Sequence, residues 1–522
     1  MKKYSNSLGG ANFSRRQFLG SSAALGLAVA VGPGLWTPRA SAQTVKGGHM
    51  KLGIAGGSTT DSLDPSTYTD TFMVMVGYTM RGNLIEVMAD GSAGAELAES
   101  FEGSDAAKKW QFKLRKGLTF SNGKTLTIED VIGSINYHRG ADTKSGAKSL
   151  LEAVTDIKAD GSDSVVFTLS AGNADFPFVL ADYHLNIMPI VDGKPDFKVG
   201  AGPYKLKDFD PGVRATFERN EKSHKSGNVD SAEMLGISDS TARQSGLRGG
   251  EVDIINRADV KTVDELAKTE QLTIVEVPGR LYYTFAMVNT VAPFDNPDVR
   301  MALKYSIDRD AVLNTILNGH GVIGNDQPIT PDYRYYATDL PARNFDPDKA
   351  KFHLKKAGAP QIEVNLSAAD AAFPGAVDAA LLYADTAGKA GMKINVVRES
   401  NDGYWDNVWL KKDFFAAYWG GRPTEDVILT IAFSKGIPWN ESKWDNAKFN
   451  ELLVAARAEL DESRRRGMYE EMQHIVSDDG GVVIPVFANN VAVTSNKVGH
   501  PEKISGVWEL DGGRCIERWW KS

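Results

Sequence analysis

The stretch WQFKLRKGLTFSNGKTLTIEDVIGSI, residues 110–135, decides the fold class. Trp110 and the apolar residues that follow it at every second position are typical of a half-buried strand. Asn122-Gly123 is a strong turn signal. Thr127-Ile-Glu-Asp130 is close to a capping box, and apolar residues follow it at helical spacing. A strand, a turn and a helix in one short stretch predict a chain that mixes both kinds of element.

The same mixture continues on both sides of this stretch. Residues 202–217 predict a β-hairpin around Asp210-Pro-Gly212. Asn296-Pro297 and Asp308 predict capped helix starts, and residues 449–476 predict a helix pair. The sequence therefore predicts an α/β protein of several domains.

Composition narrows the class of protein. The chain has 522 residues, of which 42% are hydrophobic and 24% charged, with a formal net charge of −8. These values exclude a disordered or fibrous chain. An acidic balance argues against a nucleic-acid partner. Cys515 is the only cysteine, so an intrachain disulfide and a cysteine-based zinc site are excluded.

The first 42 residues have the pattern of an export signal. They contain five basic residues and no acidic one, an apolar stretch, and Ala40-Ser-Ala42 as an A-x-A cleavage site. Ser14-Arg15-Arg16-Gln-Phe18-Leu19 resembles the twin-arginine motif. We expect cleavage after Ala42.

Removal of that segment leaves an acidic protein. Subtracting its five positive charges from −8 gives −13 for the rest of the chain. No later run approaches the length of a membrane-spanning helix, and no cysteine stands at the cleavage site to carry a lipid. We therefore predict a free periplasmic protein.

Residue patterns for catalysis or metal binding are missing. None of the eight histidines forms an H-x-x-x-H or H-x-H pair, and no phosphate-binding or nucleophile-elbow motif occurs. We predict no metal, no cofactor and no enzyme activity. The distant alternative is a glycoside hydrolase in which Glu441 and Asp445 act beside Trp439 and Trp444.

Several local signatures occur in the order found in one family. They are Leu63-Asp-Pro65, Leu97–Phe101, Trp110–Phe120 with Asn122-Gly-Lys124, Gly200–Tyr204, Gly249–Asp253, and Val299–Arg309. In this order the chain resembles the family 5 solute-binding proteins of ABC importers, the dipeptide, oligopeptide and nickel binders.

The resemblance implies a fold. It is an α/β, two-lobe periplasmic binding protein fold, type II-like and of cluster C, with an extra domain inserted in the first lobe. The implied boundaries are 43–77, 196–284 and 497–522 for lobe I, 78–195 for the inserted subdomain, and 285–496 for lobe II. Two crossing strands join the lobes, which close on a ligand by hinge motion.

Candidate ligand contacts come from both lobes. In lobe I, Ser58, Thr59 and Thr60 offer hydroxyls at a strand end, and Tyr282 lies near the hinge. In lobe II, the segment 404–444 concentrates aromatic and polar residues. Its candidate contacts are Tyr404, Trp405, Trp419, Gly420, Gly421, Arg422, Glu425, Trp439 and Asn440. Aromatic walls with a few fixed polar groups are what an enclosed polar ligand needs.

Arg422 is a departure from the resemblance. In the peptide-binding members an Asp follows the W-x-x pattern and holds the peptide's amino terminus, whereas Arg422 has that place here. Either Arg422 grips a ligand carboxylate, or Glu425 replaces the amine anchor.

The sequence thus predicts a monomeric substrate-binding component that delivers a small polar solute to an inner-membrane permease. A peptide is the leading ligand class. Opine-like amino-acid conjugates, oligosaccharides and chelated metal are the alternatives.

Overall fold

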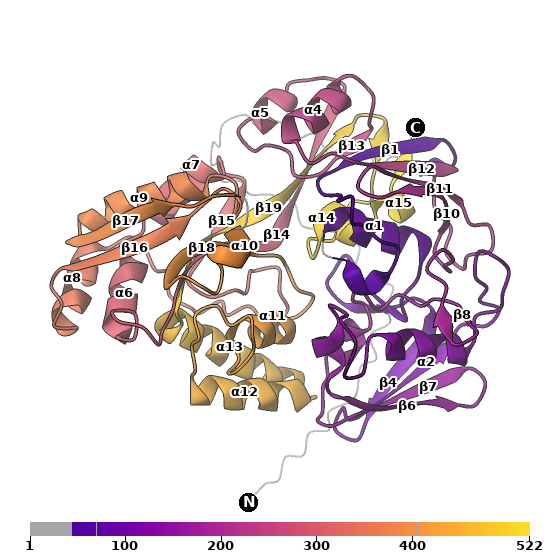
Figure 1. Cartoon of the computed structure of the whole chain (residues 1–522), viewed down its shortest axis with the longest axis horizontal. Helices are drawn as coiled ribbons and strands as arrows, with labels where there is room; N and C mark the ends of the chain where they lie inside the picture. The colour runs from indigo at the N-terminus through magenta and orange to yellow at the C-terminus, as the bar shows by residue number, and fades with distance from the viewer. Residues whose placement is uncertain (1–43, 69, 402–403) are drawn as a thin grey trace, which may run out of the picture. The chain divides into compact units, whose positions relative to one another are not determined.

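The computed structural model describes residues 44–68, 70–401 and 404–522 (Figure 1). The proposed export signal, with Arg15, Arg16 and the cleavage site Ala42, lies outside the described residues, so those predictions stay predictions.

Residues 110–135 fold as their pattern predicts. Residues Lys109–Leu114 form strand β5, in which Phe112 is fully buried. Helix α2 spans Ile128–Tyr137 and begins with a capping box between Thr127 and Asp130. The predicted strand and helix are therefore confirmed.

This segment builds a four-stranded antiparallel sheet of order β4-β5-β7-β6. Its other strands are β4 (Ala98–Ser104), β6 (Val154–Asp160) and β7 (Ser164–Leu169). Two-stranded ribbons accompany it: β2 (Ile85–Val87) with β3 (Ala93–Ala95), and β8 (Ile190–Val191) with β9 (Lys194–Pro195).

Most of the other strands form an eleven-stranded sheet. Its strand order is β10-β11-β12-β1-β13-β19-β14-β18-β16-β17, with β15 paired to β19. Its strands are β1 (His49–Ile54), β10 (Tyr204–Asp210), β11 (Arg214–Arg219), β12 (Ser231–Gly236), β13 (Ile254–Ile255), β14 (Leu272–Met287), β15 (Gly321–Ile323), β16 (Ile362–Ala368), β17 (Met392–Arg398), β18 (Phe414–Trp419) and β19 (Val482–Ser495). Parallel pairs join β1 to β12 and β13, and β16 to β17 and β18.

Strands β14 and β19 belong to both halves of this sheet (Figure 1). They pair antiparallel from Leu272↔Ser495 to Ala286↔Val482, with a register shift between Val277 and Leu281. Toward β13 they join the strands at the start of the chain, and toward β18 they join those that follow residue 285. The two-strand connection is confirmed.

Helices cover the sheets. They are α1 (Thr71–Met80), α3 (Phe176–Val179), α4 (Ser240–Arg248), α5 (Val263–Leu266), α6 (Pro297–Tyr305), α7 (Arg309–Ile316), α8 (Pro347–Lys356), α9 (Ala376–Gly388), α10 (Tyr404–Asn407), α11 (Glu425–Phe433), α12 (Ala447–Ala458), α13 (Glu462–Asp479), α14 (Glu509–Gly513) and α15 (Cys515–Arg518). Short 3-10 turns span Pro65–Thr67 and Lys148–Leu151, and a last ribbon pairs β20 (Val498–Gly499) with β21 (Trp520–Lys521). The predicted caps are confirmed: Asn296 accepts from the Asp298 N–H, and Asp308 from the Ala311 N–H.

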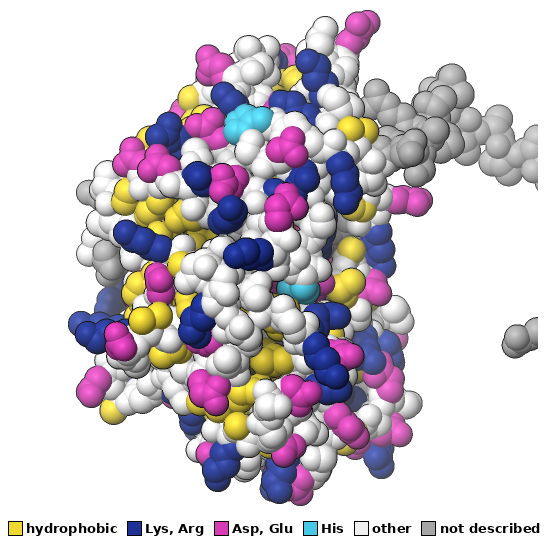
Figure 2. Space-filling view, turned by 90° about the vertical axis from the view of Figure 1, so that its right-hand side faces the viewer, with side chains coloured by type: hydrophobic (Ala, Val, Ile, Leu, Met, Phe, Trp, Pro, Cys, Tyr) yellow, Lys and Arg dark blue, Asp and Glu magenta, His cyan; other side chains and the backbone are white. Residues whose placement is uncertain are grey.

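The buried hydrophobic side chains form separate clusters. The largest lies within residues 282–488, a second mainly within 84–201, and a third draws on 50–80, 204–277 and 492–519. The domain boundaries derived from the sequence stay a prediction. Figure 2 shows basic and acidic side chains interspersed over the face that it presents, so neither sign of charge dominates there.

Candidate functional site

Five aromatic side chains around the end of β18 form the centre of the candidate site. They lie in a chain of ring contacts in the order Tyr418, Trp405, Trp409, Trp439 and Trp419, which we call the aromatic cluster. Successive ring centroids are 5.5, 6.0, 6.0 and 6.2 Å apart, and the ring planes meet at 63° to 78°. Edge-to-face contacts of this kind stabilise aromatic groups.

Three rings of the aromatic cluster face solvent. The exposed fractions are 38% for Trp405, 41% for Tyr418 and 48% for Trp439. Exposed aromatic residues gathered in one place are typical of a binding surface. Trp409, which the sequence analysis did not select, connects Trp405 to Trp439. Its place in a run of Trp and Tyr residues is the signal that could have found it.

A buried carboxyl group lies beneath the cluster. Glu441 is 2% exposed and accepts a hydrogen bond of 2.9 Å from Nε1 of Trp409. Burial raises its pKa to about 7, although the Trp409 and Trp419 side chains oppose this shift. The nearby hydroxyl of Tyr282 is buried without a hydrogen-bond partner among the described residues. Burial raises the pKa of Tyr282 well above its usual value, and the charge of Glu441 adds to the shift.

The chain leaves β18 through Gly420 and Gly421 in a fixed path. A side chain at Gly421 would meet the Val507 carbonyl oxygen at 2.6 Å and the Arg280 Cβ at 2.8 Å. Arg280 donates from Nη1 to the carbonyl oxygens of Arg422 (3.1 Å) and Pro423 (2.8 Å). Glycine at 421 and the buried Arg280 therefore fix the position of Arg422.

The guanidinium of Arg422 is only partly used by the protein. Nη1 donates to the carbonyl oxygens of Gly420 and Gly421, both at 3.0 Å. Within the described residues, Nε and Nη2 have no hydrogen-bond acceptor and no carboxylate forms an ion pair with this side chain. Nε and Nη2 together form the edge that can bind a carboxylate with two parallel hydrogen bonds.

The positive charge of Arg422 acts to lower the pKa of Asp182 and of Tyr183, which lie in the segment after α3. Asp182 is already bound, because its Oδ1 accepts from Nδ1 (2.6 Å) and N–H (3.0 Å) of His184. Burial raises the pKa of Asp182, but the interactions with His184 and the charge of Arg422 outweigh it, so the pKa lies below its usual value.

Four other predicted contacts are buried and bonded within the protein. Glu425 accepts from the Tyr335 N–H at 2.6 Å, and burial raises its pKa to about 6. The Asn440 amide donates to the carbonyls of Phe433, Ser434 and Trp444. Tyr404 donates to the Ala416 carbonyl at 2.8 Å, and Trp419 is 5% exposed. Asp426 pairs with Arg457 at 3.0 Å, so neither acid after Arg422 is a free anchor.

The loop with Ser58, Thr59 and Thr60 is exposed. The hydroxyls of Ser58 and Thr60 are 2.8 Å apart, and the Ser58 N–H donates to Asp61. No contact of the described residues joins this loop to the aromatic cluster. Its role as a ligand contact stays a prediction.

Arg257, which follows β13, approaches the cluster from the first part of the sheet, and the sequence analysis missed it. Its Nε donates to Glu509 at 2.7 Å, and Glu509 is the main cause of its raised pKa. Interaction with Tyr418 contributes to the same shift.

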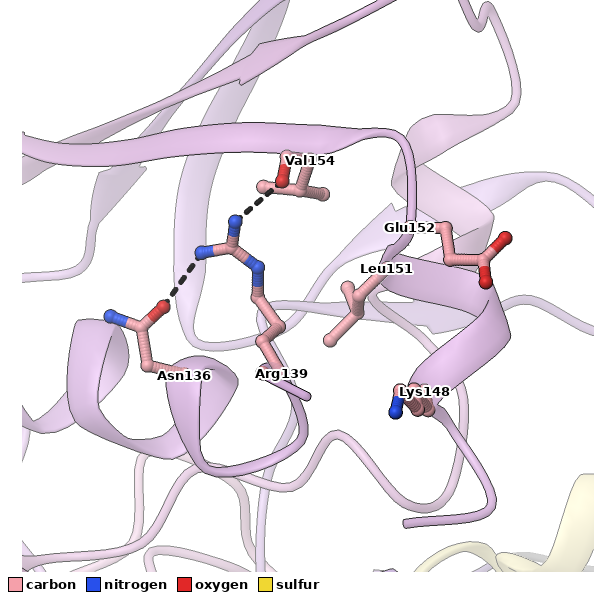
Figure 3. A pocket seen from close by; sticks show the side chains of 7 residues that line it. Asn136, Arg139, Lys148, Leu151, Glu152 and Val154 are labelled. Atoms are coloured by element: carbon pink, nitrogen blue, oxygen red, sulfur yellow. Dashed lines mark hydrogen bonds between the residues drawn. The ribbon is translucent and has the colours of Figure 1, made fainter. Parts of the chain in front are cut away.

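A surface pocket of about 420 Å³ lies elsewhere, between the end of α2 and β6 (Figure 3). Its lining includes Arg139, whose guanidinium donates to Asn136 and to the Val154 carbonyl (Figure 3). None of the predicted ligand contacts lines this pocket.

The described residues contain no group of three or more His, Cys, Asp or Glu side chains arranged to hold a metal ion. No helix in this part of the chain is long and apolar enough to cross a membrane.

The sheet topology and the candidate site define the class of protein: an α/β binding protein with two strands shared between its halves. The model of the bacterial extracellular solute-binding proteins, family 5, matches residues 93–441, and the chain belongs to this family. It is 27% identical over 462 residues to the probable D,D-dipeptide-binding periplasmic protein DdpA of Escherichia coli K12, covering 84% of this chain and 88% of that one.

Solved structures agree on the fold. The binding protein AgaA of A. tumefaciens R10, in complex with agropinic acid, has a TM-score of 0.77 and 25% identity, covering 91% of this chain and 99% of that one. DppA of Helicobacter pylori, in complex with the peptide STSA, has a TM-score of 0.76 and 20% identity, covering 92% and 99%. The predicted two-lobe periplasmic binding protein fold is confirmed, and the protein is the solute-binding component of an ABC importer.

Proposed function

We propose that the protein is a monomeric periplasmic receptor for a small peptide or amino-acid conjugate with a free carboxylate. It is exported by the twin-arginine route, closes on the ligand and presents it to the inner-membrane permease, without catalysing a reaction. The ligand class follows the relatives: DdpA is a probable D,D-dipeptide binder, and AgaA was solved with agropinic acid.

The free edge of Arg422 carries this proposal. Nη1 is held by two glycine carbonyls, which leaves Nε and Nη2 for a carboxylate beside the exposed rings of the aromatic cluster. In a closed, water-poor site such a charge-assisted pair contributes far more than a surface ion pair. Glu425 and Asp426 support the same choice, because both are already bound within the protein.

Replacement of Arg422 tests the proposal. The ligand is identified by mass spectrometry of material that co-purifies with the protein and is then titrated by calorimetry. We expect Arg422→Ala to cost about 2–5 kcal/mol of binding free energy, because the ligand carboxylate loses its partner. Arg422→Lys should recover part of the loss, since a lysine cannot form two parallel hydrogen bonds.

Arg248→Ala is the matched control, because Arg248 is exposed at the end of α4. A second test compares the binding of dialanine with that of dialanine amide, because the two compounds differ only in the carboxylate. If Arg422→Ala left the affinity for the co-purified ligand unchanged, Arg422 would not be the anchor.

A further inference from the structure

The rings of the aromatic cluster stand at steep angles to one another. Trp405 meets Trp409 at 78° and Tyr418 at 74°, and Trp439 meets Trp409 at 64°. A flat sugar ring stacks best on one extended face, whereas rings at steep angles offer faces and edges in several directions to a compact group. The electron-rich face of an indole attracts a cation more strongly than that of any other side chain.

The polar groups behind these rings are a buried carboxyl group and a buried hydroxyl group. Glu441 accepts from the Trp409 indole, and among the described residues no basic side chain pairs with it. Tyr282, 1% exposed, has a hydroxyl oxygen without a partner there. Buried polar groups are normally satisfied, and each unsatisfied one needs an explanation. The carboxyl group of Glu441 favours a positively charged group in front of these rings, although Arg422 lies close to Tyr282 and Arg257 to Tyr418.

We propose that the aromatic cluster is a subsite for an organic ammonium group of the ligand. The rings of Trp405, Tyr418 and Trp439 contact the cation. Glu441 is a positioning residue: it orients the Trp409 indole through the Nε1 hydrogen bond and places negative charge behind the rings. The subsite rests on the proposed function in one respect. If Arg422 binds a carboxylate of the same ligand, that ligand carries both a positive and a negative charge.

The tetramethylammonium ion tests the subsite without any carboxylate. Its binding to the purified exported protein is measured by saturation-transfer NMR of the methyl protons, with tert-butanol as a neutral probe of similar shape. We expect the cation to bind at least roughly tenfold more tightly than the alcohol. Trp439→Leu should weaken cation binding by roughly tenfold, while Phe352→Leu, which removes an exposed aromatic ring outside the cluster, should not change it.

The pH profile separates the positioning role of Glu441 from a purely structural one. The titratable groups that face Glu441 are Tyr282 on β14 and Tyr404 on α10, with Arg422 close to Tyr282. Burial raises the pKa of both tyrosines, so neither ionises near neutral pH. Cation binding should therefore strengthen between pH 5.5 and 8.5 as Glu441 ionises, and Glu441→Gln should remove this dependence.

Binding measurements on Arg422→Ala distinguish the ammonium subsite from the proposed carboxylate anchor. Arg422→Ala should not weaken tetramethylammonium binding, because it removes a positive charge close to Tyr282, but it should weaken binding of 4-trimethylammoniobutanoate, which carries both charges. Equal binding of the cation and tert-butanol, no cation binding, or an unaffected Trp439→Leu variant would overturn the subsite. Retained cation binding with no effect of Arg422→Ala on the dipolar probe would overturn the carboxylate anchor alone.

Discussion

Asp175→Asn perturbs the contact between the segment before α3 and helices α12 and α13. Oδ2 of Asp175 lies 2.6 Å from Nη2 of Arg465, and both side chains are 6% exposed. Next to this pair, the Ala174 N–H donates to the Arg457 carbonyl at 2.7 Å. The first segment belongs to the predicted inserted subdomain and the helices to predicted lobe II. We therefore expect the pair to connect two parts that separate in the proposed opening of the protein.

The expected cost follows from the burial of the pair. Removing one partner of a buried ion pair costs about 3–5 kcal/mol, because the other charge stays buried without compensation. Part of this cost is offset here. Burial raises the pKa of Asp426, and the charge of Asp175 raises it further, so asparagine relieves a repulsion. We expect a net loss of about 2–3 kcal/mol, which increases local opening by roughly 30- to 150-fold.

Hydrogen exchange followed by mass spectrometry measures that opening. The Ala174 amide reports on the contact directly, since its acceptor is the Arg457 carbonyl. Asp175→Asn should speed exchange in peptides that cover residues 172–176, with no change in β5. Asp142→Asn, at an exposed site of the same predicted subdomain, is the control. Unchanged exchange at residues 172–176, or an equal increase throughout β5, would refute the reasoning.

Two further predictions concern export and pH. Arg15→Lys with Arg16→Lys should leave unprocessed precursor in the cytoplasm, and a normal periplasmic yield on immunoblots would rule out the twin-arginine route. Burial lowers the pKa of Lys304 to about 7. Between pH 7 and about 10 the unfolded chain keeps a proton on Lys304 that the folded protein has lost, so this residue makes stability rise with pH by about 1 kcal/mol per unit. Urea unfolding of Lys304→Met should lack that part of the slope, and an identical slope in both proteins would contradict it.

Local signals in the sequence predicted much of the fold because they act over a few residues. The capping box at Thr127 and Asp130 and the caps at Asn296 and Asp308 need no distant partner, and the structure contains all of them. The shared strands β14 and β19 came from the family resemblance. Their register depends on pairing across about two hundred residues, which no local pattern specifies.

The candidate site was less predictable, since residue type alone does not say which way a side chain points. Glu425 was selected as a possible anchor, but its place in the first turn of α11 points it at the Tyr335 amide. Asn440 lies in the predicted segment, yet its amide is used by three carbonyls. Glu441, next in the sequence, was considered only as a catalytic acid, and its link to Trp409 required the fold.

Arg422 and Glu441 are the two unusual ionisable groups of the site, and the surrounding structure holds them in different ways. Arg422 is held by main-chain atoms that any sequence would supply, and Gly421 is required because a side chain there would meet the Val507 carbonyl at 2.6 Å. Glu441 is buried without a basic partner among the described residues, at a cost that raises its pKa to about 7. A fold gains no stability from an unpaired guanidinium edge or an unpaired buried carboxyl group. A dipolar ligand of the proposed kind would supply the opposite charges to both groups, so we interpret the two features as evidence for binding rather than for stability.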